Sequence, residues 1–370
     1  MRFESRQGAI RWYDGSVKSL IALLAALSIL QVNLLADGKV MPPQNYTGSL
    51  EEKAQEAIIV FTPGSDKKSA VQDLIIKIQV EGKVDNFAWV VPLPSKPTTR
   101  EEDAVLFKEC FNYVTARRRP PQKNRAFSIK KSAQEGASKP AAKIEVLSRE
   151  VVGSFDVAVV KENLAGALNE WLKKEGFQEL KNAEDTIGYY REKGYVFACM
   201  KVADTALSKS GSADLHPLRF TFETGGRDGI YFPMKMTGLQ KDKFDVNLYV
   251  FYRAWLNDHL NGFGFEHRGF ALNWRDYDSE DCKPNAGKTW SAPKSDPYLK
   301  NYASKIPELT RFFQTRHPGK RFYMTNIRAE GLKPKHVREW DNDLWMFPFY
   351  TDKMMVPYDA REGGAAAPKS

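Results

Sequence analysis

The stretch LIIKIQV at residues 74–80 and the stretch FAWVV at residues 87–91 decide the fold class. The first alternates with a period of two residues, which predicts a half-buried β-strand. The second is apolar on both faces, which predicts a central strand covered on both sides. Residues 81–83 (EGK) predict the turn between them. Pro92 and the two prolines after it are expected to end the second strand, because proline has no N–H to donate to a sheet.

Strand patterns continue through the chain. Two runs fall within residues 144–160, and a late strand is predicted at Arg321–Ala329. Four strands follow one another closely, at Tyr195–Val202, Leu218–Glu223, Tyr231–Thr237 and Val246–Ala254. Their connections are too short for helical crossovers, so most neighbouring strands are expected to be antiparallel.

Helical periodicity predicts four helices. They are expected at Glu101–Tyr113, Leu164–Leu172, Ala183–Lys193 and Tyr298–Arg316, with Asn163 as the N-cap of the second helix and Gly176 after its end. The sequence therefore predicts an α+β fold: a largely antiparallel, strand-rich sheet with helices packed on one face.

The N-terminus has the pattern of a secretory signal peptide. Four basic residues are followed by the apolar core SLIALLAALSIL at Ser19–Leu30, and the small residue Ala36 ends the segment. An uncleaved membrane anchor is the alternative, but it needs about 20 apolar residues, and Gln31 and Asn33 interrupt this segment. We therefore expect residues 1–36 to be removed. The mature protein is expected to be periplasmic or extracellular, with no stable membrane span.

The mature chain is expected to form a single α+β module over residues 37–350. Within it, residues 117–142 are basic and poor in large apolar side chains, which predicts a flexible surface insertion. Contact with a polyanion or an anionic envelope is the alternative for this segment. Residues 257–350 form a C-terminal extension, and residues 351–370 form a tail that is expected to be disordered at its end.

The net charge of +9 is concentrated in two segments. Residues 117–143 carry nine Lys or Arg against one Glu, and the first 18 residues carry four basic and two acidic residues, so the remainder is close to −1. A nucleic-acid groove needs basic residues spread over a structured face. The charge distribution therefore argues against a nucleic-acid partner.

Motifs of known chemistry are missing from the sequence, which has no GxSxG, HExxH, Walker or Rossmann signature. Asp276, Asp278 and Glu280 resemble the start of a calcium loop, but the central glycine and the distal glutamate of such a loop are missing. Asp258-His259 and Glu266-His267 lack the spacing of zinc ligands. We expect no cofactor, keep calcium as the alternative, and leave catalytic residues unassigned.

The three cysteines, Cys110, Cys199 and Cys282, are too few for a disulfide scaffold. None of them lies in a CxxC pattern. Two states stay open: one disulfide with one free thiol, or three free thiols.

Several segments together resemble one bacterial family. They are Ala36–Gly38, 52–61 (EKAQEAIIVF), 73–97 (DLIIKIQVEGKVDNFAWVVPLPSKP), 194–202 (GYVFACMKV), 216–223 (HPLRFTFE), 246–255 (VNLYVFYRAW) and 321–334 (RFYMTNIRAEGLKP). These segments resemble the family known as domain of unknown function 2330, whose members look like secreted or envelope proteins. Its most specific element is the FAWVVP motif, which consists of Phe87, Ala88, Trp89, Val90, Val91 and Pro92. The resemblance implies no activity, cofactor or catalytic residue, and we expect this motif to be structural.

The expected function is that of an exported envelope module with a non-catalytic binding or structural role. Its partner would be an envelope or extracellular protein or polymer. The alternative is an extracytoplasmic hydrolase or metal-dependent enzyme whose site is assembled only in three dimensions. A deep pocket lined by carboxylates or histidines with shifted pKa values would favour the enzyme.

Overall fold

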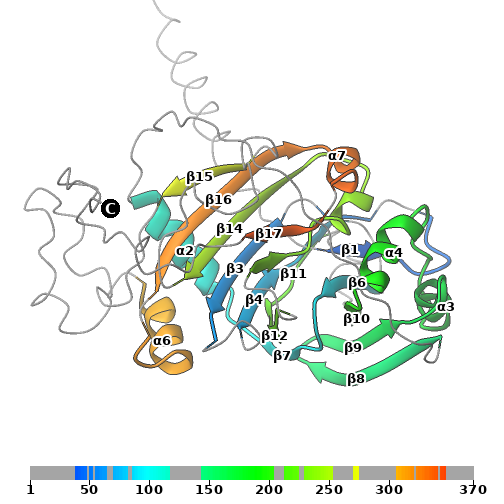
Figure 1. Ribbon diagram of the computed structural model, residues 1–370, viewed down its shortest axis with the longest axis horizontal. Coiled ribbons are helices and arrows are strands. Elements are labelled where there is room, and N and C mark those ends of the chain that lie inside the picture. Colours follow the sequence, from blue (N-terminus) through cyan, green and yellow to red (C-terminus); the bar gives the residue numbers. More distant parts are fainter. Residues whose placement is uncertain are drawn as a thin grey trace, which may run out of the picture. The chain divides into compact units, whose positions relative to one another are not determined.

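Two large β-sheets form the core of the protein (Figure 1). The computed structural model describes residues 38–47, 50–52, 55–64, 70–81, 86–116, 143–203, 212–224, 229–252, 270–274, 306–320, 322–340 and 342–346. All of them belong to one compact unit, Leu34–Ser370. Among these residues, no helix combines the length and the apolar character needed to cross a membrane.

The first sheet has five strands, each antiparallel to its neighbours. Their order is β1 (Lys39–Met41), β6 (Asn86–Leu93), β10 (Val196–Ala203), β9 (Phe155–Glu162) and β8 (Ile144–Val152). The FAWVVP motif lies in β6, and Phe87–Val91 are buried. Trp89 pairs with Val40 on one side and with Met200 on the other, and its side chain is fully buried.

The second sheet has seven strands. Their order is β15 (Phe270–Trp274), β16 (Tyr323–Leu332), β14 (Phe244–Tyr252), β3 (Gln55–Thr62), β4 (Val71–Lys77), β12 (Leu218–Glu223) and β7 (Thr98–Glu101). Only β3 and β14 are parallel among these neighbours. Two small sheets complete the described part: β11 (Ser212–Asp214), β5 (Gln79–Glu81) and β2 (Glu51–Glu52), and the pair β13 (Ile230–Phe232) and β17 (Leu344–Met346).

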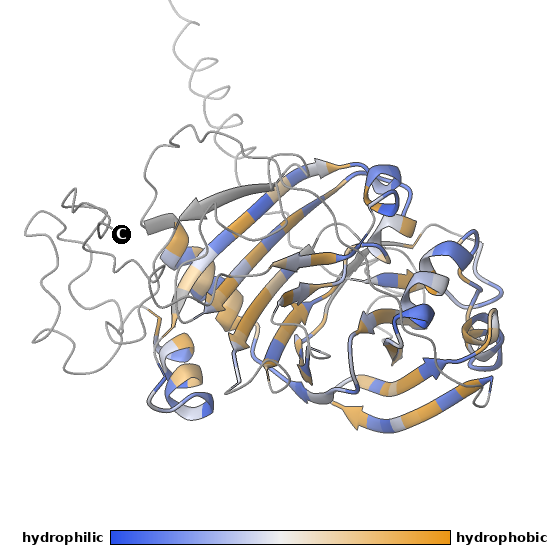
Figure 2. Ribbon diagram, viewed as in Figure 1, coloured by the Kyte–Doolittle hydropathy of each residue, from blue (hydrophilic) through white to orange (hydrophobic). Residues whose placement is uncertain are grey.

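The central strands of the seven-stranded sheet are apolar at both odd and even positions and are buried on both faces (Figure 2). In β3, Ala57, Ile59 and Phe61 join the main core, which is continuous with the five-stranded sheet. Ile58 and Val60 point to the opposite face and join a second core, to which helices α2 (Val105–Ala116) and α6 (Pro307–Arg316) contribute. We call this second face the helix-covered face.

The helices pack in two pairs, one on the helix-covered face and the other against the main core. The two helices on the helix-covered face are joined by Glu109 of α2, whose carboxylate accepts hydrogen bonds from the N–H groups of Glu308 and Leu309 at the start of α6. This carboxylate satisfies donors that the first turn of a helix leaves unpaired. Helices α3 (Ala167–Lys174) and α4 (Glu184–Glu192) contribute Leu168, Leu172 and Ile187 to the main core.

The α+β fold and the antiparallel character predicted from the sequence are confirmed. The strands divide into two large sheets, a division that the sequence pattern did not specify. The pattern of apolar residues identifies strands, but it does not say which strands become neighbours. That depends on pairing between distant residues, such as Val71 with Glu223 and Lys39 with Val90.

Three local predictions need correction. Strand β6 continues through Pro92 to Leu93. Tyr231 donates a hydrogen bond of 3.1 Å to the Pro92 carbonyl. The N and O of a strand residue point to the same side, so the ring nitrogen of Pro92 faces away from β10 and the ladder loses no donor.

The second correction concerns α3, which begins after Gly166 and not after Asn163. The N–H of Asn163 bonds to the carbonyl of Lys143, and Glu162 accepts a hydrogen bond from the N–H of Leu168 in place of a cap residue. The third concerns Tyr231–Thr237, where β13 ends at Phe232 and a 3-10 turn, η1 (Thr237–Leu239), follows.

The C-terminal extension contributes strands to the seven-stranded sheet and side chains to the main core. Strand β16 lies between β14 and β15, and Trp345 of β17 is buried in the main core. The short helix α7 (Pro334–Arg338) follows β16 and contacts η1. The predicted leader 1–36, the basic insertion 117–142 and the tail 351–370 lie outside the described residues.

Candidate functional site

The helix-covered face carries two polar clusters separated by apolar side chains. Its centre is formed by Ile58, Val60 and Ile75, which pack under α2 and α6. One cluster forms around Asp73 of β4, and the other around Glu56 of β3, which pairs with Lys77 at the end of β4. Charged residues on a buried sheet face are uncommon unless they are paired, so both clusters are candidates for function.

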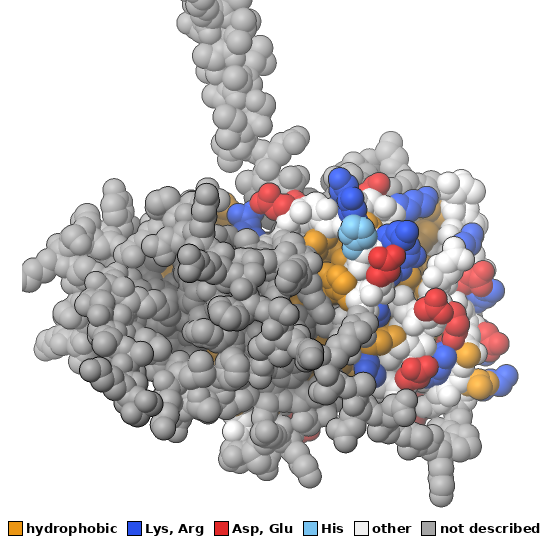
Figure 3. Space-filling view, turned by 45° about the horizontal axis from the view of Figure 1, so that its top comes forward, with side chains coloured by type: hydrophobic (Ala, Val, Ile, Leu, Met, Phe, Trp, Pro, Cys, Tyr) orange, Lys and Arg blue, Asp and Glu red, His pale blue; other side chains and the backbone are white. Residues whose placement is uncertain are grey.

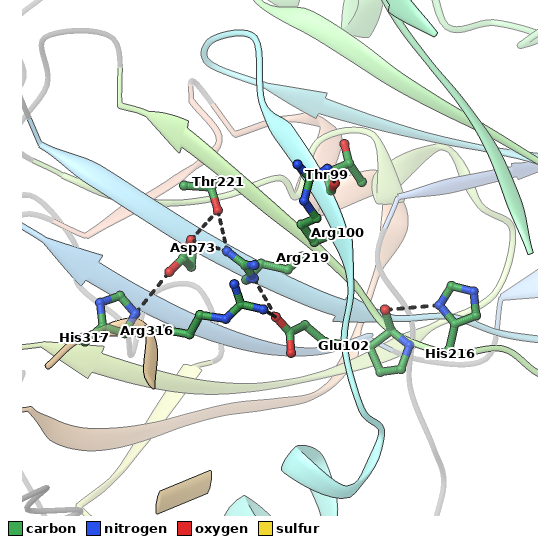
Figure 4. A network of polar contacts seen from close by, with 10 residues as sticks. Asp73, Thr99, Arg100, Glu102, His216, Arg219, Thr221, Arg316 and His317 are labelled. Atoms are coloured by element: carbon green, nitrogen blue, oxygen red, sulfur yellow. Dashed lines mark hydrogen bonds and ion pairs between the residues drawn. The ribbon is translucent and has the colours of Figure 1, made fainter. Parts of the chain in front are cut away.

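The Asp73 cluster is built from β4, β12, the segment after β7 and the end of α6 (Figure 4). Strand register places Thr221 opposite Asp73, and Thr221 donates a short hydrogen bond to Asp73 Oδ1. Arg219 Nη1 lies 3.4 Å from the same oxygen, and Arg219 Nε donates a hydrogen bond of 2.6 Å to Glu102 Oε1. Arg219 therefore bridges two carboxylates that come from different elements.

The end of α6 completes this cluster. Arg316 Nη2 lies 3.7 Å from Glu102, and His317 Nε2 lies 3.2 Å from Asp73 Oδ2. The His317 ring is almost buried and packs among Phe312, Phe313 and Phe322. Its Nε2 is at ion-pair distance from the carboxylate, but it is not aligned for a hydrogen bond.

The electrostatics of the cluster keep Asp73 ionised. Burial acts to raise its pKa, but the contacts with His317 and Thr221 and the charge of Arg219 outweigh burial, so the pKa is lowered. An aspartate next to a histidine is the pair that orients a general base in many hydrolases. Among the described residues, however, the hydroxyl beside this pair is that of Thr221, and it donates to Asp73 itself.

The Glu56 cluster is a row of polar residues across three strands. Asn247 Nδ2 donates to Glu56 Oε1 at 3.0 Å and lies 2.9 Å from Tyr249 Oη, and Asn326 Nδ2 donates to Asn247 Oδ1 at 2.8 Å. Burial raises the pKa of Glu56 to about 7, although hydrogen bonds with Tyr249 and Asn247 and the charges of Lys77 and Arg328 act to lower it. Asn326 Oδ1 is buried without a hydrogen-bond partner.

Other buried carboxylates serve the backbone. Asp343 accepts hydrogen bonds from the N–H groups of Met234 and Lys235 and from the hydroxyl of Tyr231, and burial raises its pKa. These bonds direct the chain away from β13 after Phe232. Glu162 joins α3 to α4 through Leu168 and Arg191.

The metal candidates from the sequence cannot be placed in this arrangement. Asp276, Asp278 and Glu280 lie outside the described residues, as do Asp258-His259 and Glu266-His267. Within the described ranges, no three His, Cys, Asp or Glu side chains form a group that could hold a metal ion.

Two of the three cysteines are described, and they are not paired with each other. Cys110 lies in α2 and Cys199 in β10, and both are buried free thiols. Burial, followed by the charge of Glu56, raises the pKa of Cys110, so this thiol stays protonated and is a poor nucleophile. Cys282 lies outside the described residues.

The model of a family of uncharacterised proteins conserved in bacteria, domain of unknown function 2330, matches residues 57–288. The chain belongs to this family. The matched range contains Asp73, Glu102 and Arg219 but ends before Arg316 and His317, so the Asp73 cluster joins the matched part of this DUF2330 protein to the segment beyond it. No curated protein matches the chain, and no solved structure matches it.

Sequence reasoning missed both polar clusters. Asp73, Arg219 and Thr221 lie in stretches that predict strands, but alternation alone assigns such residues to a solvated face. The available signal was the opposite charge of Asp73 and Arg219 on strands of similar pattern. Without the register of β4 against β12, that signal could not be turned into a contact.

Proposed function

We propose that this DUF2330 protein is an exported envelope module with a non-catalytic role, in which it binds an envelope or extracellular protein or polymer or contributes structure. The Asp73 cluster carries this proposal. Its carboxylates face Arg219, Arg316 and His317, so the charges of the cluster are matched internally and link three elements. Such a cluster stabilises the packing of these elements, as expected for a structural or binding module.

The surface and the leader support the same role. On the face in Figure 3, basic and acidic side chains of the described residues are interspersed. This mixture suits a protein, or a polymer that is not a polyanion, better than a polyanionic partner. The pattern of residues 1–36 supports export. The periplasm or the exterior of the cell is therefore the proposed location.

The experiment has two parts. N-terminal sequencing of the native protein should give a start at or near Asp37, whereas an intact Met1 in the membrane fraction would overturn the export proposal. The mature protein, used as bait on the native envelope, should retain a partner. The conservative variant His317→Gln is expected to retain the same partner at wild-type yield, because the proposed role of His317 is internal.

A second candidate is an extracytoplasmic hydrolase or a metal-dependent enzyme. The contact between His317 and Asp73 favours it, since this pair is suited to general-base chemistry. A panel of ester, peptide and glycoside substrates tests this candidate, with and without divalent metal. Hydrolysis that is lost in His317→Gln, while the unfolding curve stays unchanged, would replace the non-catalytic role by the enzymatic one.

A further inference from the structure

His216 fixes the turn between β8 and β9. The N–H of Ser154 in this turn donates a hydrogen bond of 2.9 Å to His216 Nε2. His216 lies in the connection between β11 and β12, 62 residues further along the chain. One hydrogen bond therefore joins the end of a hairpin to a different sheet.

The geometry determines the protonation state that this contact needs. Because Nε2 accepts a hydrogen bond, it carries no proton, and the ring proton is on Nδ1, which lies 3.3 Å from the Pro217 carbonyl oxygen. The ring also meets Phe155 edge to face, with centroids 4.9 Å apart. The neutral ring is thus held on three sides.

The turn is shaped to receive this ring. Gly153 has φ +56°, and a Cβ on it would lie 2.1 Å from His216 Nε2. The residues on either side of the turn, Val152 and Phe155, are paired with each other and buried in the main core. The contact with His216 therefore concerns the two turn residues between them, Gly153 and Ser154.

We propose that His216 is a pH-sensitive latch: its neutral ring accepts the N–H of Ser154 in the β8–β9 turn, and protonation of Nε2 breaks that contact. A proton on Nε2 points at the N–H of Ser154, so that two donors face each other and the hydrogen bond is lost. Histidine is the side chain that ordinarily changes its charge between about pH 5 and 8.

The charged groups around His216 determine where the protonated ring lies. Glu101 of β7 faces the ring, with Oε1 3.8 Å from Nδ1, and attracts the protonated form. The charged residues of the hairpin include Glu150, which pairs with Arg100, and Asp156, which pairs with Arg149. The protonated ring therefore stays beside Glu101, while the N–H of Ser154 loses its acceptor.

The latch is tested by hydrogen exchange of the Ser154 amide in the full chain. After correction for the intrinsic exchange rate, its protection is expected to fall about fivefold or more between pH 7.5 and 5.0, as the loss of one hydrogen bond implies. An amide in the central strand β10, such as that of Ala198, serves as the internal reference. Unchanged protection of Ser154 over this range overturns the proposal without the need for any variant.

Two variants separate the titration from the contact. His216→Gln keeps an oxygen that can accept from Ser154 but cannot titrate, so its protection should be independent of pH. His216→Ala removes the acceptor and should lower protection equally at both pH values. If His216→Gln shows the same response to pH as the wild type, the proton acts elsewhere and His216 is not the switch.

Discussion

Gly38 packs directly against the indole of Trp89: a Cβ on Gly38 would lie 2.4 Å from Trp89 Nε1 and 2.8 Å from the carbonyl oxygen of Val90. Gly38 also has φ +112°, a conformation that other residues rarely adopt. It comes directly before β1, the edge strand that covers one side of β6. The two family segments that contain these residues therefore meet in space, and glycine is required where they meet.

The variant Gly38→Ala is expected to be destabilised by about 2–4 kcal/mol. About 1 kcal/mol comes from the positive φ, and the remainder from the overlap with Trp89. Gly176→Ala is the matched control, because Gly176 has φ +93° but nothing within 4 Å of the added Cβ. Urea denaturation measures both. Equal losses in the two variants would show that the contact with Trp89 contributes nothing.

The variant Trp89→Ala is expected to lose about 3–5 kcal/mol of the free energy of unfolding, because the side chain is fully buried in the main core. Trp171→Ala in α3 is the comparison, since Trp171 only lies partly buried against the same core and should cost less. Chemical denaturation followed by circular dichroism gives both values. A Trp89→Ala protein of wild-type stability that fails to retain its envelope partner would make this motif the binding site.

Features of the fold that depend on neighbouring residues could be predicted from the sequence, and features that depend on distant residues could not. Alternation and continuous apolar runs, as in Leu218–Glu223 and Phe87–Val91, depend only on neighbouring residues and correctly identified strands. The division into two sheets depends on pairings between residues more than 100 positions apart, such as Tyr249 with Ile58. No local pattern contains that information.

The polar clusters show the same limit. In the sequence, Arg219 is an ordinary polar residue on the less apolar side of a strand. In the structure, β4 places Asp73 beside Arg219, and His317 at the end of α6 contacts the same aspartate. Asn163 was a reasonable N-cap by composition, but Glu162 supplies the acceptor from the preceding strand. In both cases the hydrogen-bond or charge partner comes from another element, and not from the residue that the local sequence pattern predicts.

The variant Asp73→Asn is expected to be destabilised by about 3 kcal/mol at neutral pH, because it leaves the buried Arg219 without one of its two carboxylate partners. Asp73 has a lowered pKa, so its stabilisation is present above the unfolded pKa and is lost as the pH falls through the folded one. The difference between wild type and variant should therefore shrink in acid. Asp156→Asn is the control, since its ion pair with Arg149 is partly exposed to solvent and should contribute at most about 1 kcal/mol.

Glu56 should make the protein less stable as the pH rises. Its pKa is raised from 4.5 to about 7, chiefly by burial, so the folded state keeps a proton that the unfolded state has already lost between these two values. Its favourable contribution is therefore complete below about pH 4.5, declines as the pH rises, and is gone above about pH 7. The expected decline is about 3 kcal/mol.

The variant Glu56→Gln isolates this contribution, because glutamine fills the same position between Asn247 and Tyr249 but cannot ionise. Unfolding free energies of wild type and variant are compared from pH 4.5 to 8, and the wild type should lose stability relative to the variant over that interval. Glu179→Gln is the control: the hydrogen bond from Lys173 lowers the pKa of Glu179, so removal of this carboxylate cannot produce a decline with rising pH. A constant difference between wild type and Glu56→Gln would mean that Glu56 stays ionised in the folded protein, and that Lys77 and Arg328 together outweigh its burial.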